Sequence, residues 1–320
     1  METIVAVPEI RLLFGRKGTT CQRHGAEALL DLAVPVLCGP DEELFVTGQE
    51  TDTLEVTGPF QVLRSADGEI RAGVAALPCH GLGESVAYEL YHHLLEITAG
   101  QSLYRVWNFV PGINAETNGL EHYRSFNIGR CRAFRERFGE SGIEPHLPAA
   151  SAVGIDDPHL VVVFLTGRAP VSYFENPLQV PAYRYPEQYG PCSPSFARGA
   201  VVDHGPFGGR VGYLSGTASI CGHETVGEGD VVKQLEMTMA NIRLMMEKMG
   251  FSEALDPSSS IVSDFRVYLR DPVDLEIVRQ RFSAVVGEAV AKRVVYLKAD
   301  VCRAKLQLEI EGIFSDSADG

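Results

Sequence analysis

The sequence contains two stretches in which helix-like and strand-like segments follow one another in the same order. In the first stretch the order helix, strand, helix, strand falls at residues 84–98, 103–110, 121–138 and 159–166. In the second stretch the same order falls at residues 229–249, 261–269, 271–286 and 293–301. The first strands of the two stretches also share a short motif, YRVW at 104–107 and FRVY at 265–268. We therefore predict an α/β fold with two copies of one unit, each with helices on one face of a sheet.

Periodic apolar residues and capping signals define the helix-like segments. The segment 229–249, for example, has Asp230 as a start signal and Gly250 as a stop signal. The first 75 residues contain short alternating segments separated by Gly and Asp turns, which is typical of β-strands. We expect a domain boundary in PAASAVGIDDPH, which divides the chain into an N-terminal α/β domain, 1–155, and a C-terminal domain, 156–320.

Composition limits the class of function. The net charge of −14 argues against nucleic acid as a partner, and an anionic substrate would need local arginines in its site. No apolar run is long enough to predict a membrane span, and the N-terminus lacks the features of a secretory signal. The seven scattered cysteines include no C-x-x-C pair, so we expect neither a zinc site nor a disulfide framework, and we expect a cytoplasmic protein.

One long segment, 172–199, has no helical or strand period but contains five prolines and six aromatic residues. Loops of this length inside compact domains are usually functional or disordered, and the aromatic content argues against disorder. The segment includes Tyr183, Arg184, Tyr189 and Arg198, which combine hydroxyl donors with two cations. Because an arginine can bind a carboxylate through two parallel hydrogen bonds, this inventory suits a small carboxylate ligand.

Near the C-terminus, VCRAKLQLEIEGIF (301–314) has the pattern of a strand with charged residues among apolar ones. Residues two apart in a strand share a face, so Arg303, Glu309 and Glu311 are expected to point together. They form either a structural ion pair or the wall of an anion site with a proton donor beside it. Cys302 is either a small buried residue or a nucleophile.

Two further segments contain candidate site residues. In SGTASICGHET (215–225), Gly216 leaves room for a ligand close to the backbone. In YRSFNIGRCRAF (123–134), Arg124 and Arg130 are six residues apart, and by pattern alone they are solvated arginines. The phosphate-loop, dinucleotide-binding and nucleophile-elbow motifs are all absent from the sequence.

Five segments, in this order, resemble motifs of the chorismatase family: YRVWNFVPGIN, HYRSFNIGRCRAF, PSFARG, SGTASICGHET and VCRAKLQLEIEG. The resemblance runs from about residue 80 to residue 314. Residues 211–314 also resemble the RidA/YjgF-like fold, a chorismate-mutase-like α/β unit that normally forms trimers with ligand sites at the subunit junctions. The resemblance implies two RidA/YjgF-like units arranged as a pseudo-trimer in one chain, with the site between the two halves.

Chorismatases remove the enolpyruvyl side chain of chorismate as pyruvate. The resemblance implies that the first glutamate of EIEG, Glu309, is the acid that protonates this side chain. It ties the 3-hydroxybenzoate product to the glycine of SGTAS, Gly216, and to a cysteine seven residues before the acid, Cys302. Our candidates for contact with the substrate are Arg124, Arg130, Tyr183, Tyr189, Arg198 and Gly216.

We therefore expect a chorismate-cleaving enzyme that forms 3-hydroxybenzoate and pyruvate without a metal or other cofactor, as a monomer or weak oligomer. Alternatives within the family are the hydrolytic subtype, which gives a trans-dihydroxycyclohexadiene carboxylate, and the 4-hydroxybenzoate-forming subtype. Two other classes remain open from the RidA-like half alone. One is an imine deaminase, and the other is a non-catalytic module that binds a small ligand.

Overall fold

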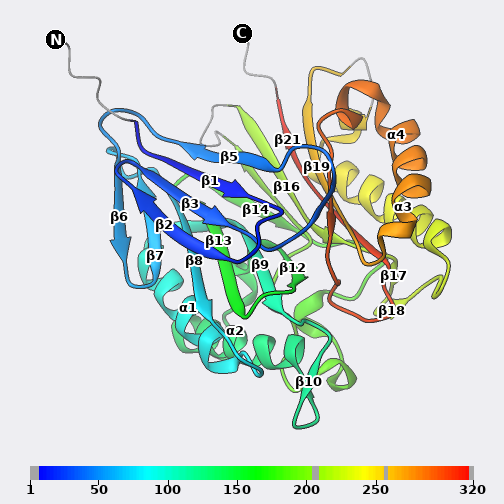
Figure 1. Cartoon of the computed structure of the whole chain (residues 1–320), viewed down its shortest axis with the longest axis horizontal. Helices are drawn as coiled ribbons and strands as arrows, with labels where there is room; N and C mark the ends of the chain where they lie inside the picture. The colour runs from blue at the N-terminus through cyan, green and yellow to red at the C-terminus, as the bar shows by residue number, and fades with distance from the viewer. Residues whose placement is uncertain (1–6, 204–208, 256–258, 317–320) are drawn as a thin grey trace.

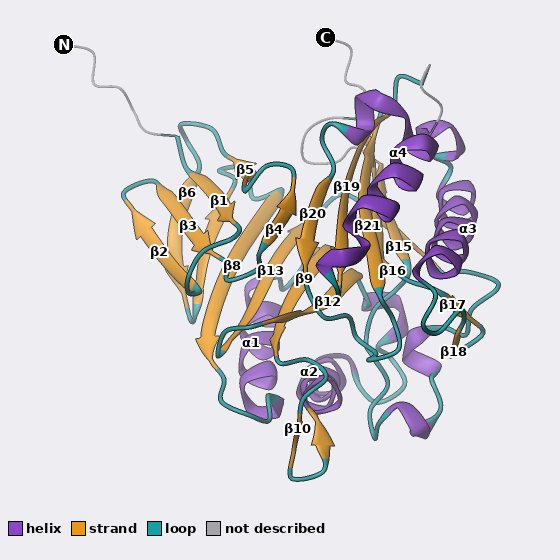
Figure 2. Ribbon diagram, turned by 45° about the vertical axis from the view of Figure 1, so that its right-hand side comes forward, coloured by secondary structure: helices purple, strands orange, loops and turns teal. Residues whose placement is uncertain are grey.

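The computed structural model describes residues 7–203, 209–255 and 259–316, and three sheets dominate these residues (Figures 1 and 2). The first is a six-stranded sheet in the order β12-β9-β13-β8-β7-β6. Its strands are β6 (Thr53–Thr57), β7 (Phe60–Arg64), β8 (Ile70–Pro78), β9 (Ser102–Pro111), β12 (Ala149–Ile155) and β13 (His159–Gly167). Helices α1 (Glu84–Ile97) and α2 (His122–Phe138) cover one face of it.

The second sheet has seven strands in the order β14-β15-β16-β21-β19-β20-β4. Its strands are β4 (Val36–Cys38), β14 (Val171–Phe174), β15 (Gly199–Asp203), β16 (Arg210–Thr217), β19 (Val262–Leu269), β20 (Val295–Lys298) and β21 (Leu308–Ser315). Helices α3 (Val231–Met249) and α4 (Leu275–Ala291) cover its outer face (Figure 2). The prediction of two α/β units with helices on one face of a sheet is confirmed.

A third sheet, β2-β3-β1-β5, is formed by the N-terminal region. Its strands are β1 (Glu9–Leu13), β2 (Thr20–His24), β3 (Glu27–Asp31) and β5 (Glu42–Thr47). Apolar residues from all three sheets form one central core, whereas each helix pair has a separate core with its own sheet. Three sheets around one core fit the predicted pseudo-trimer in one chain. Two short hairpins, β10 (Glu116–Thr117) with β11 (Leu120–Glu121) and β17 (Ile220–Cys221) with β18 (Glu224–Thr225), complete the strands.

Capping signals predict helix ends well. The side chain of Asp230 accepts a hydrogen bond from the backbone N–H of Lys233 at the start of α3, and Gly250 ends this helix with a φ of 76°. That left-handed conformation is one that glycine adopts without steric cost. The helix expected at 271–286 begins at Leu275, after a short 3-10 turn, and continues past a kink at Gly287.

Two predictions about segments need correction. Residues 149–155 form β12, a buried strand parallel to β9, and β13 continues the same sheet beyond residue 155. The first sheet therefore does not end at the expected domain boundary, because a run of small residues in PAASAVG hides a strand. The strand expected at 301–314 begins only at Leu308, so Cys302 and Arg303 lie in the turn before β21.

Candidate active site

A cavity of about 240 Å³ lies where the two helix-covered sheets meet. Its walls come from α2, β12, β16, β21, the long loop after β14 and the turn before β21. Every predicted site residue except Tyr183 lines this cavity: Arg124, Arg130, Tyr189, Arg198, Gly216, Cys302 and Glu309. The predicted position of a site between the two halves agrees with this geometry.

Glu309 is the buried acid of the cavity. It lies on β21 and is 3% exposed, and its Oε1 atom has no hydrogen-bond partner among the described residues. Burial, followed by the negative charge of Glu311, raises the pKa of Glu309 to about 8, although Arg105 and Arg198 act in the opposite direction. A carboxyl group with this pKa is mostly protonated at neutral pH.

Gly216 makes room for this carboxyl. The pairing of β16 with β21 shifts register between Leu214 and Thr217, so Gly216 lies at an irregularity in the sheet. A Cβ atom at Gly216 would overlap Oε1 of Glu309 and would lie 2.6 Å from its Cδ atom. The absence of a side chain at this position is therefore what lets the acid occupy its place.

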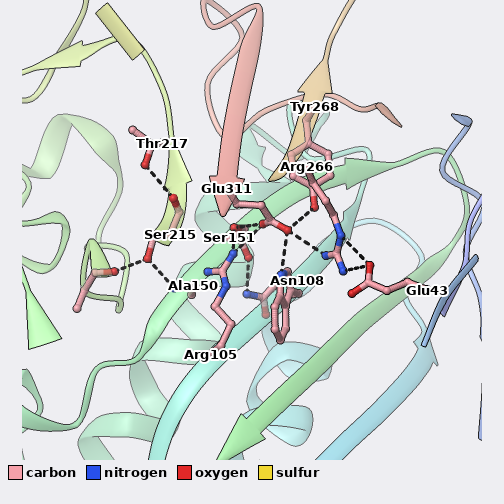
Figure 3. A network of polar contacts seen from close by, with 12 residues as sticks. Glu43, Arg105, Asn108, Ala150, Ser151, Ser215, Thr217, Arg266, Tyr268 and Glu311 are labelled. Atoms are coloured by element: carbon pink, nitrogen blue, oxygen red, sulfur yellow. Dashed lines mark hydrogen bonds and ion pairs between the residues drawn. The ribbon is translucent and has the colours of Figure 1, made fainter. Parts of the chain in front are cut away.

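Glu311, two residues beyond Glu309, has the opposite surroundings (Figure 3). Its Oε2 atom accepts hydrogen bonds from Arg105 (2.7 Å) and Ser151, and its Oε1 atom accepts three more. The donors to Oε1 are Trp107 Nε1 (2.9 Å), Arg266 Nη1 (2.9 Å) and the Tyr268 hydroxyl (3.1 Å). Burial alone would raise the pKa of Glu311, but the two arginines, with the hydroxyls of Ser151 and Tyr268, hold it below its ordinary value.

Three arginines on the cavity wall each have one N–H group without a partner among the described residues. Arg130 donates to Asn127 Oδ1 at 2.7 Å and leaves Nε free. Arg198 donates to the hydroxyl of Tyr185 at 2.6 Å and also leaves Nε free. Arg303 donates to the carbonyl of His223 at 2.7 Å and leaves Nη2 free. The cavity wall therefore contains three guanidiniums whose buried nitrogens are not all paired within the described residues.

Aromatic residues of the long loop hold the cations in place. The guanidinium of Arg303 lies 4.2 Å from the ring centroid of Tyr189 and 5.1 Å from that of Tyr185. Tyr189 in turn donates its hydroxyl hydrogen to the carbonyl of His223, at 2.6 Å. Arg124, nearer the opening, forms an ion pair of 3.3 Å with Glu121. The loop thus supplies Arg198 and the rings that position Arg303.

Cys302 faces the same cavity from the turn before β21 and is half-buried. Burial, followed by the charge of Glu309, raises the pKa of the Cys302 thiol to about 12. Burial, followed by Cys302, also raises the pKa of the neighbouring Tyr123. Both groups are therefore neutral at physiological pH, and Cys302 is not an activated nucleophile.

Tyr183 lies elsewhere. It lines a separate hollow with Glu144, Glu175 and Tyr173, on the other side of the long loop. Sequence reasoning also missed several wall residues: Tyr123, Ser151 and Tyr185. Tyr123 and Tyr185 stand beside predicted arginines in sequence, a signal that could have found them, whereas nothing in the small-residue run around Ser151 indicates a site.

Within the described ranges, no group of three or more His, Cys, Asp or Glu side chains could hold a metal ion. In the same part of the chain, no helix is both long and apolar enough to span a membrane. The cavity thus combines a buried carboxyl group of raised pKa with three arginines, which are the kinds of group that acid catalysis on a small anionic ligand requires.

Residues 44–166 match the family model described as "Chorismatase FkbO/Hyg5-like, N-terminal". The chain is 34% identical over 305 residues to a 3-hydroxybenzoate synthase of Streptomyces hygroscopicus, covering 91% of this chain and 86% of the relative. It is 36% identical over 245 residues to a chorismatase of the same organism, covering 72% of this chain and 69% of the relative. The chain belongs to the chorismatase family.

A solved chorismatase structure agrees with this assignment. A chorismatase crystal structure superimposes with a TM-score of 0.84 and 28% identity, covering 98% of this chain and 95% of that chain. A Rid-family protein from Yersinia pestis also matches, with 16% identity and a TM-score of 0.35 over 46% of this chain and 99% of its own.

Proposed function

We propose that this chorismatase converts chorismate to 3-hydroxybenzoate and pyruvate, with Glu309 as the proton donor to the enolpyruvyl group. The observation that supports this role most directly is the buried carboxyl of Glu309, whose pKa is raised to about 8 in a cavity lined by cations. One of the similar proteins is named 3-hydroxybenzoate synthase, which favours this product over the others of the family.

Substrate binding follows from the free donors. Chorismate has two carboxylates, and the protein has a net charge of −14, so the site must supply local positive charge. Arg130, Arg198 and Arg303 each have a buried N–H group that a carboxylate can accept from. Because each guanidinium is already held by a second contact, little side-chain entropy is lost when the ligand binds.

The proton transfer begins from neutral Glu309. The acid donates its proton to the methylene carbon of the enol ether, which leaves an oxocarbenium-like carbon on the side chain and a carboxylate on Glu309. Arg105 and Arg198, whose charges favour the ionised form of Glu309, stabilise the carboxylate as it develops. The neighbouring ring hydroxyl oxygen then attacks the ring carbon that holds the ether, the ring carbon–ether oxygen bond breaks, and its electrons complete the carbonyl of the leaving pyruvate. The hydroxyl proton returns to the Glu309 carboxylate and a ring epoxide remains. The epoxide opens at its other C–O bond, the carbon that keeps the oxygen loses its hydrogen as a proton and the oxygen gains one, which gives 3-hydroxybenzoate.

Gly216 and Cys302 are the proposed determinants of the product. Gly216 sets the position of the acid, and the neutral thiol of Cys302 lies on the same wall. We place a proton-transfer role on this thiol during aromatisation, since its pKa of about 12 keeps the hydrogen available for donation. We further propose a cytoplasmic monomer or weak oligomer, consistent with seven free thiols.

The test is a product assay. Incubation with chorismate, followed by chromatographic separation and an assay of pyruvate, is expected to give equal amounts of 3-hydroxybenzoate and pyruvate. Pyruvate with a trans-dihydroxycyclohexadiene carboxylate would identify the hydrolytic subtype, and 4-hydroxybenzoate would identify the third subtype. No pyruvate, with turnover of 2-aminoacrylate-type imines instead, would overturn the proposal in favour of a deaminase.

A further inference from the structure

The repeated motif of the two units meets at a single carboxylate. Arg105 and Trp107 belong to YRVW on β9, and Arg266 and Tyr268 belong to FRVY on β19. All four donate hydrogen bonds to Glu311. The equivalent positions of two halves of the chain, more than 150 residues apart in sequence, thus serve one buried anion (Figure 3).

Each oxygen of Glu311 is fully used by donors. Oε1 accepts from Trp107, Arg266 and Tyr268, and Oε2 accepts from Arg105 and Ser151. A proton on either oxygen would displace one of these donors and leave it buried without a partner, which is costly. The geometry therefore holds Glu311 in its ionised form.

Glu309 lies two residues before Glu311 on β21 and is in the reverse situation. The two side chains are two residues apart on β21, and their partners on β19 are Tyr268 for Glu309 and Arg266 for Glu311. Oε1 of Glu309 accepts no hydrogen bond from the described residues. When two buried carboxyls lie close together and share a low-dielectric site, the one with fewer donors keeps the proton.

We propose that Glu311 is a positioning residue, a fixed anion that keeps the proton on Glu309 and so maintains the acid in its reactive form. This inference rests on the proposed role of Glu309 and adds the reason why that residue is protonated at neutral pH. Ser151 completes the connection, because its hydroxyl contacts both Arg105 and Glu311 while the residue also lines the cavity.

Other charged and titratable groups also face this carboxyl pair. The sheets contribute Arg105 from β9 and Arg266 and Tyr268 from β19. The cavity wall contributes Tyr123 and Arg130 from α2, Arg198 from the long loop, and Cys302 and Arg303 from the turn before β21. Arg105 and Arg198 favour ionisation of Glu309, whereas Glu311 opposes it. Neutralising Glu311 removes this opposition and leaves Arg105 and Arg266 without their anion, so both effects drive the proton off Glu309.

The experiment compares Glu311→Gln with a matched control, Asp264→Asn. Both substitutions remove one negative charge, and Asp264 lies on β19 in an exposed ion pair of 2.9 Å with Arg293. In Glu311→Gln we expect the alkaline limb of kcat/KM to move down by at least about one pH unit, which lowers kcat/KM about tenfold above the limb. Lowering the pH restores activity. In Asp264→Asn we expect the alkaline limb of the kcat/KM profile to lie at the same pH as in the wild type.

A direct measurement separates this inference from the proposed reaction. The infrared carbonyl band of protonated Glu309, assigned by its loss in Glu309→Gln, is followed against pH without any substrate. In the wild type the band disappears as the pH rises through about 8. In Glu311→Gln it disappears at lower pH. This measurement stands even if chorismate is not turned over.

Trp107→Phe covers the case in which Glu311→Gln does not fold. It removes one donor to Oε1 of Glu311 and keeps every charge, so the Glu311 anion is less compensated and opposes ionisation of Glu309 more strongly. We therefore expect a small shift of the band to higher pH, opposite to the shift in Glu311→Gln. A band of Glu309 that titrates at the same pH in the wild type, in the folded Glu311 variant and in Trp107→Phe would overturn the proposal.

Discussion

Gly216 and Glu309 lie so close that a single methyl group on the glycine would overlap the carboxyl of the acid. The Cβ of an alanine at position 216 would lie 2.6 Å from Cδ of Glu309 and 3.1 Å from Oγ of Ser151. Gly216 does not have a positive φ, so its backbone tolerates an L-residue. The requirement for glycine at this position is therefore steric, and it concerns the carboxyl of Glu309 first and the hydroxyl of Ser151 second.

Gly216→Ala tests this relationship. The added methyl pushes the carboxyl of Glu309 away from its present position, and we expect the rate of pyruvate release to fall at least about tenfold, since small displacements of a reacting group are costly. The matched control is Gly18→Ala, because a Cβ at Gly18 would meet only Asp157 Oδ2, at 3.8 Å. Wild-type pyruvate release by Gly216→Ala would show that Glu309 does not need this space.

Glu309→Gln tests the acid itself. The amide has nearly the same shape but has no acidic proton, so we expect pyruvate release to fall by about 100- to 10,000-fold. Circular dichroism should show an unchanged fold, and chorismate should still bind, because the arginines remain. Turnover close to that of the wild type would exclude Glu309 as the proton donor.

The same variant makes a prediction about stability. The folded-state pKa of Glu309, about 8, lies above its ordinary value of 4.5, so the unfolded chain releases this proton first as the pH rises. The stability that neutral Glu309 contributes at low pH is lost progressively between these two values. Glu309→Gln avoids this loss, so its Tm should exceed that of the wild type by more at pH 8 than at pH 5. Equal differences at both pH values would contradict the raised pKa.

The sequence predicts the α/β units because these depend on local signals, whereas most wall residues of the site are predicted through the resemblance to chorismatases. Helix periodicity, the caps at Asp230 and Gly250, and the alternation of Glu309 and Glu311 on one strand face are all local. Two features escaped prediction because tertiary contacts decide them. Small residues form β12 only because β9 pairs with them, and Cys302 leaves the strand pattern to enter a turn against the cavity.

The misplaced residue Tyr183 has a similar explanation. The loop after β14 contains several tyrosines, and the sequence cannot show which ones point toward the cavity. A short 3-10 turn at Ala182–Arg184 buries Ala182 and directs Tyr183 to the neighbouring hollow, whereas Tyr185 and Tyr189 reach the cavity. In the sequence, YRVW and FRVY are visible only as a repeat. Their convergence on Glu311 depends on how the two sheets pack against each other.

Cys302→Ala tests the proposed product selector. Burial raises the pKa of this thiol to about 12, so it acts as a neutral hydrogen donor. We expect the variant to form more dihydroxycyclohexadiene carboxylate and less 3-hydroxybenzoate, measured by chromatography with total pyruvate as the reference. Cys221→Ala, which changes an exposed thiol outside the cavity, should keep the product ratio. An unchanged ratio in Cys302→Ala would show that the thiol has no part in the choice.

Arg198→Lys tests how the substrate is held. The guanidinium of Arg198 is buried, its Nη2 atom donates to the Tyr185 hydroxyl at 2.6 Å, and its Nε atom has no partner among the described residues. Lysine keeps the charge but loses the planar pair of donors, so we expect KM for chorismate to rise at least about tenfold, with a smaller change in kcat. Tyr185→Phe releases the guanidinium and should raise KM less. Arg184→Lys is the control, because Arg184 is exposed and pairs with Glu144 at 2.9 Å outside the cavity. If Arg198→Lys and Arg184→Lys have the same KM, the carboxylates of chorismate are held by Arg130 and Arg303 without Arg198.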